Sequence, residues 1–518
     1  ALDQVHDYAL DLKNFHLGSH NLEIFPILIA TEAKDIEPKK VELAKDFVAS
    51  PLCSSANQLR STIDGILIDF GKKIEEFCLE TEKWENSGYM PRPTIIEAAQ
   101  ALYKSHSVNE IARYDAGAKN LAKTTQEIFS IIENSKKLKK KSICFVTGVP
   151  GAGKTLAGLN IATSRSEFTD ENAVFLSGNG PLVDVLREAL ARDRVEEKKL
   201  KKKTADREVR SFIQNIHHFR DEYFANSNAP VEKVVIFDEA QRAWSKKQAT
   251  KFMTGKWGDG YSPQSEPEFL TSIMDRHKDW CCIICLIGGG QEINTGEAGI
   301  IEWFNALDSF VEDWDVYVSQ VLTDPHYTID KAAVEKLWSP NFVKSDFLHL
   351  STSMRSFRAE TVSSFVSEVI NCDSAKAAQF YKELSSKYSI KMTRKLSKAR
   401  LWLRDNARGN ERTGLVASAG AQRLRPEGIF IKSEIDATNW FLNKKSDVRS
   451  SYYLEDVATQ FHVQGLELDW VGLCWDADLR IEDQKWKTYR FIGSKWQNIH
   501  SPDKQTYLLN AYRVLLTR

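Results

Sequence analysis

A glycine-rich segment ends in a lysine and a threonine at the spacing that binds nucleotide phosphates. Gly148, Gly151 and Gly153 precede Lys154 and Thr155 in the pattern G-x-x-x-x-G-K-T. Glycines let backbone N–H groups approach phosphate oxygens, the lysine reaches the β- and γ-phosphates, and the threonine hydroxyl is a Mg²⁺ ligand. The apolar run ICFVT before the segment and the helical pattern TLAGLNIAT after it supply the strand and helix that such a loop requires. The pattern predicts binding of ATP and Mg²⁺.

Two adjacent carboxylates follow a second apolar run. Residues 234–237 (VVIF) have the composition of a buried strand, and Asp238 and Glu239 come directly after them. In enzymes with a phosphate-binding loop, a carboxylate at this place coordinates Mg²⁺. We therefore assign Asp238 to the metal, together with Thr155, and Glu239 to polarising the attacking water. The alternative is a strand that ends in a solvated acidic turn, and the presence of the phosphate loop disfavours it.

A third apolar run, residues 280–287, is followed by the letters GGGQ, of which the last is Gln291. A glutamine at the end of such a strand can sense the γ-phosphate and transmit its loss, so Gln291 is a candidate sensor. Cys281, Cys282 and Cys285 lie within the run, where cysteines usually pack as small hydrophobic residues. No matching Cys or His group follows nearby in the sequence to favour a zinc site.

These residues can form one site only if the strands before them end beside one another. The sequence has the alternation of strands and helices that such a sheet requires. From residue 142 the apolar runs ICFVTG, AVFLSG, VVIFDE and CCIICLIGG alternate with helical stretches, which predicts a parallel sheet covered by helices. The rhythm weakens after about residue 310. It resumes with FLHLS, TGLVAS, YYLEDVATQ and WVGLCW, which predicts a second α/β unit up to the C-terminus.

The first part of the chain has a different texture. Residues 3–15 repeat apolar side chains at the spacing of an amphipathic helix, and residues 25–30 (FPILIA) have the composition of a buried strand. Residues 34–135 are mostly helical in pattern. Because the chain begins at Ala1 and ends at Arg518 inside an apolar segment, we expect it to be a piece of a longer protein.

The composition is that of an ordinary globular protein. The chain has 518 residues, enough for about three domains, with 42% hydrophobic and 27% charged residues, which excludes disordered and fibrous classes. The 70 basic and 71 acidic side chains nearly cancel, so the net charge is uninformative about partners. Eight sparse cysteines and the lack of a long apolar run predict a cytoplasmic protein without a membrane partner.

In their order along the chain, the phosphate loop, DEAQ and GGGQ resemble the first RecA-like half of a superfamily-one helicase. Residues 350–356 (LSTSMRS) resemble the fourth motif of that superfamily, and residues 510–518 (NAYRVLLTR) resemble its sixth. The resemblance implies that Arg355 and Arg518 reach the γ-phosphate from the second half as arginine fingers. Such an arginine neutralises charge that develops on the transferred phosphoryl group.

Residues 459–467 (TQFHVQGLE) are similar to the fifth motif, in which the glycine and the glutamate face the nucleotide and the nucleic acid. That likeness implies nucleotide-binding roles for Gly465 and Glu467. From about residue 140 to the end, the phrases VTGVPGAGKTLAGLN, VVIFDEAQRAW and LLNAYRVLLTR resemble a narrower family. It is the bacterial group with a Schlafen-group-three-like DNA/RNA helicase domain.

The resemblance implies an α/β fold with two RecA-like P-loop domains behind a mostly helical N-terminal region. The expected division is a first RecA-like domain at 136–310, a connecting segment at 311–345 and a second RecA-like domain at 346–518. The helical region occupies 34–135. Residues 1–33 resemble the back half of a PD-(D/E)XK nuclease core, through Gln4, Tyr8 and the strand FPILIAT. An ordinary amphipathic helix and core strand is the alternative.

In that nuclease fold the metal-binding residues lie on strands before the Gln–Tyr helix, so we expect no nuclease activity from this chain alone. The whole pattern predicts an ATPase that acts as a translocase or helicase on DNA or RNA, with a single-stranded tract as its track. The alternative is a nucleic-acid-gated ATPase switch that licenses an attached nuclease or a partner protein without unwinding. A non-catalytic ATP-binding scaffold is disfavoured by Glu239 and by both arginines.

Overall fold

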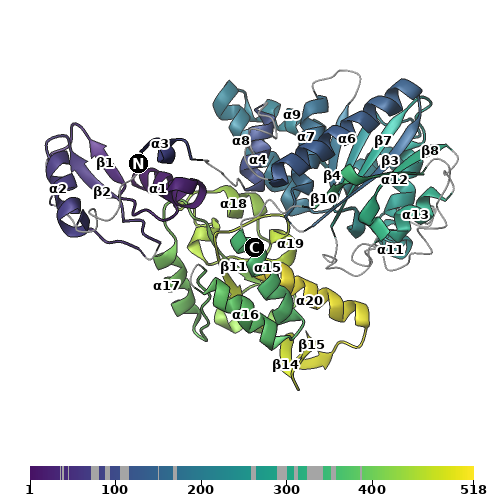
Figure 1. Ribbon diagram of the computed structural model, residues 1–518. Helices are drawn as coiled ribbons and strands as arrows, with labels where there is room; N and C mark the ends of the chain where they lie inside the picture. Colours follow the sequence, from purple (N-terminus) through teal and green to yellow (C-terminus); the bar gives the residue numbers. More distant parts are fainter. Residues whose placement is uncertain are drawn as a thin grey trace.

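The computed structural model shows two α/β units and an N-terminal segment (Figure 1). The structure describes residues 1–34, 37, 40–44, 46–71, 81–87, 94–104, 116–149, 151–166, 172–257, 264–288, 300–308, 313–323, 342–351, 357–385 and 388–517. Among the helices in these ranges, none is both long and apolar enough to cross a membrane.

The first unit is built on a parallel sheet with the strand order β5-β4-β6-β7-β3-β8-β9, and β10 pairs with β3. Its strands are β3 (Lys141–Gly148), β4 (Ala173–Ser177), β5 (Ile213–Asn215), β6 (Val234–Asp238), β7 (Cys281–Gly288), β8 (Trp314–Ser319), β9 (Phe342–Ser345) and β10 (His349–Leu350). The central strands β3, β4, β6 and β7 are the apolar runs that the sequence predicted. They are buried on both faces, which is why they read as continuous apolar segments.

Helices cover both faces of this sheet, and successive strand residues alternate between the two resulting hydrophobic cores. One face carries α4 (Ile95–Tyr103), α6 (Ala116–Leu138), α7 (Lys154–Ser166), α8 (Gly180–Lys198) and α9 (Lys202–Phe212). The other face carries α10 (Ile216–Phe224), α12 (Glu266–Met274) and α13 (Ile301–Leu307). The remaining elements of the unit are η3 (Ala240–Arg242), α11 (Lys246–Trp257), η5 (Gln320–Thr323) and η6 (Asp346–Leu348).

The first sheet extends further along the chain than the sequence predicted. Strands β8 and β9 lie in the segment that we expected to be a connection, and β10 is the strand FLHLS that we assigned to the second unit. Buried and half-buried residues alternate along most of β8, because this strand lies near the edge of the sheet. That alternation lacks the continuous apolar run by which the central strands were recognised.

The second unit contains a smaller parallel sheet of the order β12-β11-β13. Its strands are β11 (Thr413–Ala417), β12 (Val457–Thr459) and β13 (Trp470–Cys474). Around it lie α15 (Phe357–Ile370), α16 (Ser374–Leu384), α17 (Leu396–Asn406), η7 (Gln422–Glu427), α18 (Ala437–Leu442), η8 (Ser451–Tyr453), α19 (Gln460–Val463) and α20 (Pro502–Leu516). An antiparallel sheet of β14 (Leu479–Glu482), β15 (Lys485–Ile492) and β16 (Lys495–Asn498), which the sequence did not predict, follows β13.

The N-terminal segment has the expected helix and strand, and also a strand within the region that we expected to be helical. Its elements are α1 (Leu2–Phe15), η1 (Leu17–Ser19), β1 (Ile27–Ala30), β2 (Leu52–Ser55), α2 (Leu59–Phe70) and α3 (Thr81–Glu85). Strand β2 pairs in parallel with β1. We call residues 1–55 the N-terminal module.

The module lies against the second unit near α17 (Figure 1). The Arg408 guanidinium donates to both carboxylate oxygens of Asp46, at 3.0 and 2.7 Å. Asp7 accepts hydrogen bonds from the backbone and side chain of Asn410, at 2.8 and 2.6 Å. The start of the chain is therefore attached to the loop that leads into β11, the central strand of the second unit.

Candidate functional site

The predicted phosphate loop joins the end of β3 to the start of α7. Gly151 and Gly153 have φ angles of 77° and 84°, which an L side chain adopts only with strain. At Gly148 a Cβ would lie 2.9 Å from the Cβ of Leu350, so glycine is required by the close approach of β10. The Lys154 ammonium donates to the carbonyl oxygens of Gly148 at 2.7 Å and of Val149 at 3.1 Å. The loop thus bends tightly around its own lysine.

Asp238 lies at the carboxyl end of β6, 3% exposed, facing the start of α7. The Thr155 hydroxyl donates to its carboxylate, 3.2 Å from each oxygen. Burial, with the adjacent charge of Glu239 as the second cause, raises the pKa of Asp238 to about 7. Thr155 and Lys154 act in the opposite direction but do not outweigh these effects. A cation beside this carboxylate would therefore relieve an unfavourable buried charge.

Glu239 is held by a residue to which the sequence assigned no role. Its backbone is left-handed, with a φ of 54°, so its side chain leaves the line of the strand. The amide of Gln241 donates to the Glu239 carboxylate at 2.6 Å, and its carbonyl oxygen accepts the backbone N–H of Gly288 at 3.0 Å. Gln241 is 3% exposed. Gln241 thus holds Glu239 against the end of β7. Its only signal in the sequence was its position at the end of the DEAQ segment.

Strand β10 forms one side of the phosphate loop. The backbone N–H of Val149 donates to the carbonyl of Leu350 at 3.1 Å. The neighbouring His349 ring lies 2.9 Å from the Thr147 hydroxyl, which donates to Ser319 of β8 at 2.7 Å. Burial, and secondarily the charge of Lys154, lowers the pKa of His349. The segment that carries the predicted fourth motif therefore begins beside the loop.

Three predicted catalytic residues, Gln291, Arg355 and Arg518, lie outside the described residues. The elements next to them are described: β7 ends at Gly288, β10 at Leu350 and α20 at Leu516. In the register of the sheet, Gly288 is the partner of Gly148. The strand that leads to Gln291 therefore ends level with the phosphate loop.

Gly465 and Glu467, predicted to bind nucleotide, follow α19 in the second unit. Gly465 has a φ of 80°, and a Cβ there would lie 3.0 Å from Leu182 of α8. Glu467 is exposed. The contact recorded for Gly465 thus lies at the boundary between the two units.

Gln464, which the sequence assigned no role, joins the two units. It is 1% exposed. Asn179, the N-cap of α8, donates to its carbonyl oxygen at 2.7 Å, and the Arg242 guanidinium donates to its side-chain oxygen at 2.5 Å. Asn179 and Arg242 follow β4 and β6, so both approach from the carboxyl edge of the first sheet. The signal for Gln464 was its place inside the fifth motif, immediately before Gly465.

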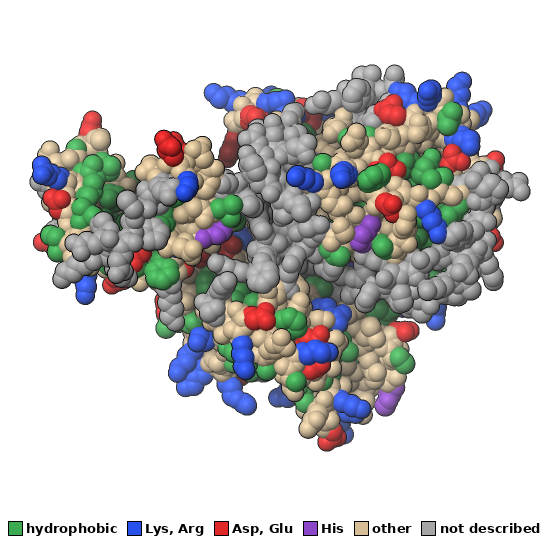
Figure 2. Space-filling model, in the orientation of Figure 1, with side chains coloured by type: hydrophobic (Ala, Val, Ile, Leu, Met, Phe, Trp, Pro, Cys, Tyr) green, Lys and Arg blue, Asp and Glu red, His purple; other side chains and the backbone are tan. Residues whose placement is uncertain are grey.

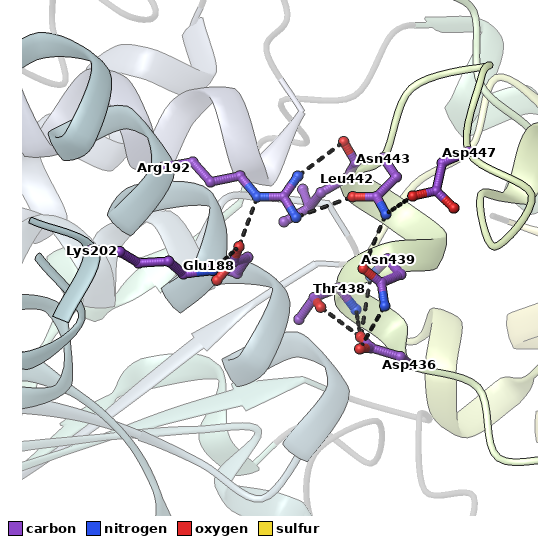
Figure 3. Close-up of polar contacts among 9 residues, drawn as sticks. All are labelled: Glu188, Arg192, Lys202, Asp436, Thr438, Asn439, Leu442, Asn443 and Asp447. Carbon is purple, nitrogen blue, oxygen red and sulfur yellow. Dashed lines mark hydrogen bonds and ion pairs between the residues drawn. The ribbon is translucent and has the colours of Figure 1, made fainter.

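A second polar contact between the units lies further along α8 (Figure 3). The Arg192 guanidinium donates to the Asn443 side chain at 3.1 Å and to the Leu442 carbonyl at 3.5 Å, at the end of α18. Glu188 holds this guanidinium through a 2.8 Å bond to Nε and also accepts from Lys202 at 2.9 Å. The second unit is therefore held at the N-cap of α8 and again near its C-terminal end.

The arrangement brings a lysine, a hydroxyl and two carboxylates to the carboxyl edge of one parallel sheet, where α/β proteins bind ligands. The large parallel sheet covered by helices makes the chain an α/β protein, which is the fold class that the sequence predicted. The Schlafen group 3 DNA/RNA helicase domain model matches residues 141–518, and the chain belongs to that family.

Comparison with individual proteins adds little to this assignment. No curated protein matches the chain. Among solved structures, the chain is similar to the Pyrococcus furiosus Hef helicase domain with a TM-score of 0.25 and 13% identity, over 68% of this chain and 88% of that one. A likeness of that size does not define the fold, so the assignment rests on the family match.

Proposed function

We propose that the protein is an ATP-dependent nucleic-acid translocase or helicase of the superfamily-one type. The observation that carries the proposal is the Thr155 hydroxyl donating to both oxygens of the buried Asp238 carboxylate, directly after the phosphate-loop lysine. Membership of a DNA/RNA helicase domain family supports a nucleic acid as the partner. The role of Lys154 is to bind the β- and γ-phosphates, and Glu239, oriented by Gln241, accepts the proton of the attacking water.

Thr155 and Asp238 fit a Mg²⁺ site. Within the described residues no group of three or more His, Cys, Asp or Glu side chains forms a metal site, so the remaining ligands would be water and phosphate oxygens, which Mg²⁺ prefers. Bound there, Mg²⁺ neutralises charge on the phosphates. The raised pKa of Asp238 supports this assignment, because a buried carboxylate beside Glu239 favours a cation or a proton.

A RecA-like architecture in both units is part of the proposal. It is supported by the order of the first sheet, in which β7 separates the phosphate-loop strand β3 from the carboxylate strand β6, and by the parallel β11–β13 sheet of the second unit. Gln291 would sense the γ-phosphate, and Arg355 and Arg518 would reach it from the second unit. Closure of the units on ATP and opening after hydrolysis would move a bound strand.

A second candidate is a nucleic-acid-gated switch that licenses an attached module. The contacts of Asp46 with Arg408 and of Asp7 with Asn410 favour it, because they join the N-terminal module to the second unit. The Gln4–Tyr8 hydrogen bond of 2.9 Å on α1 and the parallel β1–β2 pair are compatible with a nuclease-like origin of that module. A bacterial, cytoplasmic protein is the setting that the sequence resemblance and the sparse cysteines favour.

The test is steady-state ATP hydrolysis, alone and with single-stranded DNA, duplex DNA or RNA, in a salt series. We expect stimulation by one polymer that weakens as salt increases, because phosphate contacts release counterions. Lys154→Ala should decrease turnover by at least about 100-fold. Lys203→Ala, a change of the same charge at an exposed position of α9, is the matched control.

Retained turnover in Lys154→Ala would refute the assignment of the phosphate loop. Stimulated turnover without strand displacement, on a substrate with a single-stranded tail, would favour the switch over the helicase.

A further inference from the structure

The antiparallel sheet β14–β16 has two different faces. Its inner face packs on the second unit through Trp486, which donates to the Val369 carbonyl of α15 at 3.1 Å and stacks on Trp475 with ring centroids 5.6 Å apart. From the strand register, the opposite face carries Arg480, Glu482, Lys485, Lys487, Tyr489, Phe491, Trp496 and Asn498. We call these residues the outer face. Strands β14 and β15 project from the end of the second unit remote from the large sheet (Figure 1).

Planar side chains gather on the outer face. The Arg480 guanidinium lies 3.7 Å from the centroid of the Tyr489 ring and 5.8 Å from that of the Trp496 ring. Trp496 meets Phe491 edge to face, with centroids 5.2 Å apart. Tyr489, Phe491 and Trp496 are only half-buried, so parts of these rings are accessible. Single-stranded nucleic acids stack their bases on neighbouring aromatic rings and guanidinium planes of this kind.

The charge of this sheet differs from that of the whole chain. Residues 479–500 contain five basic side chains and two acidic ones, whereas the chain has a net charge of −1. On the outer face Lys485 and Lys487 are exposed, and Glu482 pairs with Arg480 at 3.1 Å. Lys and Arg side chains are visible among others at the same end of the molecule in Figure 2. The outer face thus combines basic charge with aromatic rings.

We propose that the outer face binds a single-stranded nucleic acid, with bases stacked on Tyr489, Phe491, Trp496 and the Arg480 plane, and phosphates near Lys485 and Lys487. This inference rests on the proposed function, and it identifies a surface that contacts the nucleic acid along which the proposed translocase moves. A duplex buries the faces of its bases, so stacking side chains select single strands. Aromatic cross-strand pairs also stabilise small sheets, but packing by itself does not account for the exposed lysines beside them.

The sheet is connected to the predicted sixth motif. The backbone N–H of Tyr489 donates to the carbonyl of Asp478 at 2.7 Å. The Asp478 carboxylate accepts from Tyr512 of α20 at 2.5 Å and from Ser418, just after β11, at 2.6 Å. Asp478 is fully buried. The outer face is thus joined to the helix that leads to Arg518 through the backbone carbonyl and the carboxylate of Asp478.

The experiment compares charge reversals on the two faces of the same sheet. In the register Lys487 lies on the outer face, whereas Lys495 lies on the inner one, and both are exposed. Binding of fluorescein-labelled oligothymidylate and oligouridylate to the full chain is measured by anisotropy in a salt series. We expect Lys487→Glu to weaken binding about tenfold and to decrease the salt slope by about 0.7, and Lys495→Glu to change the affinity less than about twofold.

Stacking is tested separately at Trp496. Trp496→Leu should weaken binding about tenfold, and Trp496→Phe, which retains a ring, should restore most of it. Thermal melting of each variant shows whether the sheet remains folded. The thymidylate and uridylate arms identify DNA or RNA as the track.

Equal effects of Lys487→Glu and Lys495→Glu, or equal affinities of the two Trp496 variants, would refute binding at the outer face while leaving the ATPase proposal intact. A wild-type chain that binds neither oligonucleotide would refute both the outer-face proposal and a nucleic-acid motor.

Discussion

Asp238 and Glu239 are neighbours in the chain, but their surroundings give them different properties. Asp238 is buried at the end of β6 and has Thr155 as a hydrogen-bond partner, whereas Glu239 turns out of the strand and is held by Gln241. These surroundings agree with the roles proposed for them, Asp238 at the metal and Glu239 at the water molecule. The hydrogen bond from Gly288 to Gln241 couples the second carboxylate to β7.

The raised pKa of Asp238 predicts a pH-dependent affinity for Mg²⁺. Below its folded pKa of about 7 the carboxyl holds a proton, so Mg²⁺ affinity and ATP turnover should fall as pH decreases through that value. Without metal, the folded state should lose stability as pH rises from about 4 to about 7, because the unfolded carboxyl ionises first. Thermal melting from about pH 5 to about pH 8 measures the change in stability without Mg²⁺ and, with Mg²⁺ added, the change in metal affinity.

Asp238→Asn should decrease the loss of stability between about pH 4 and about pH 7, to which other buried carboxyls such as Asp469 also contribute, and should abolish the stabilisation by Mg²⁺. Asp503→Asn, at an exposed position in the first turn of α20, is the control of equal charge and should retain both. Stabilisation by Mg²⁺ that persists in Asp238→Asn would show that the metal binds elsewhere.

At the scale of elements, α8 is the helix through which the two units meet. Its N-cap Asn179 contacts Gln464, Leu182 lies against Gly465, and Arg192 reaches the end of α18. Because α8 follows β4, its N-terminus lies at the same sheet edge as the phosphate loop, whereas Arg192 lies further along the helix. If the proposed nucleotide site is correct, a change there would reach the second unit at two points on one helix.

We predict that Arg192→Ala loosens the contact between α8 and α18. The Arg192 side chain is 39% exposed, so the lost hydrogen bonds are worth only about 1 kcal/mol, which corresponds to about a fivefold increase in the open population. Hydrogen exchange of the α18 amides measures this open population. Lys202→Ala removes a partner of Glu188 within the first unit and should leave that exchange unchanged. Equal exchange rates in the two variants would contradict the role of Arg192.

At the scale of the whole molecule, the two units share hydrophobic packing. One cluster of buried side chains includes Leu182 and Leu186 of α8 together with Trp440, Val463 and Val514 of the second unit. The N-terminal region contacts both units. The module of residues 1–55 is attached to the second unit through Asp46 and Asp7, and α4 and α6 pack on the first.

Gly409 provides a test of the attachment of the N-terminal module. It has a φ of 51°, and a Cβ there would lie 1.9 Å from the Asp7 carboxylate. Gly409→Ala should therefore displace the Asp7 carboxylate, break its hydrogen bonds with Asn410 and increase hydrogen exchange in α1. Gly428→Ala is matched for backbone strain, because Gly428 has a φ of 83° with nothing within 4 Å of the added Cβ. The backbone strain of each change should cost about 1 kcal/mol, and only Gly409→Ala should also increase the exchange of α1.

If α1 exchanges equally in Gly409→Ala and Gly428→Ala, the contact with Asp7 does not hold the module. ATP turnover of the two variants, with and without nucleic acid, would then show whether attachment of the module affects the proposed site.

Residues 1–33 and the first sheet show which elements can be predicted from sequence patterns within short segments. The helix at 2–15 and strands β3, β4, β6, β7, β11 and β13 were predictable, because amphipathic periodicity and continuous apolar runs are properties of short segments. Strands β2, β8 and β9 and the β14–β16 sheet were not, and β10 was predicted as a strand but assigned to the second unit. They are short, lie near sheet edges or alternate aromatic and charged residues, so their pairing depends on distant strands.

The sequence by itself determined which residues could bind phosphate and metal, because Gly148 to Thr155 form a local motif and Asp238 and Glu239 directly follow a recognisable strand. Only the tertiary structure decided which distant residues meet them. Gln464 joins Asn179 and Arg242, His349 and Leu350 line the phosphate loop, and Trp496 gathers with Tyr489 and Arg480. The reason is physical: these contacts depend on strand register and on how helices pack across the sheet, which are set by the cooperative burial of the whole chain.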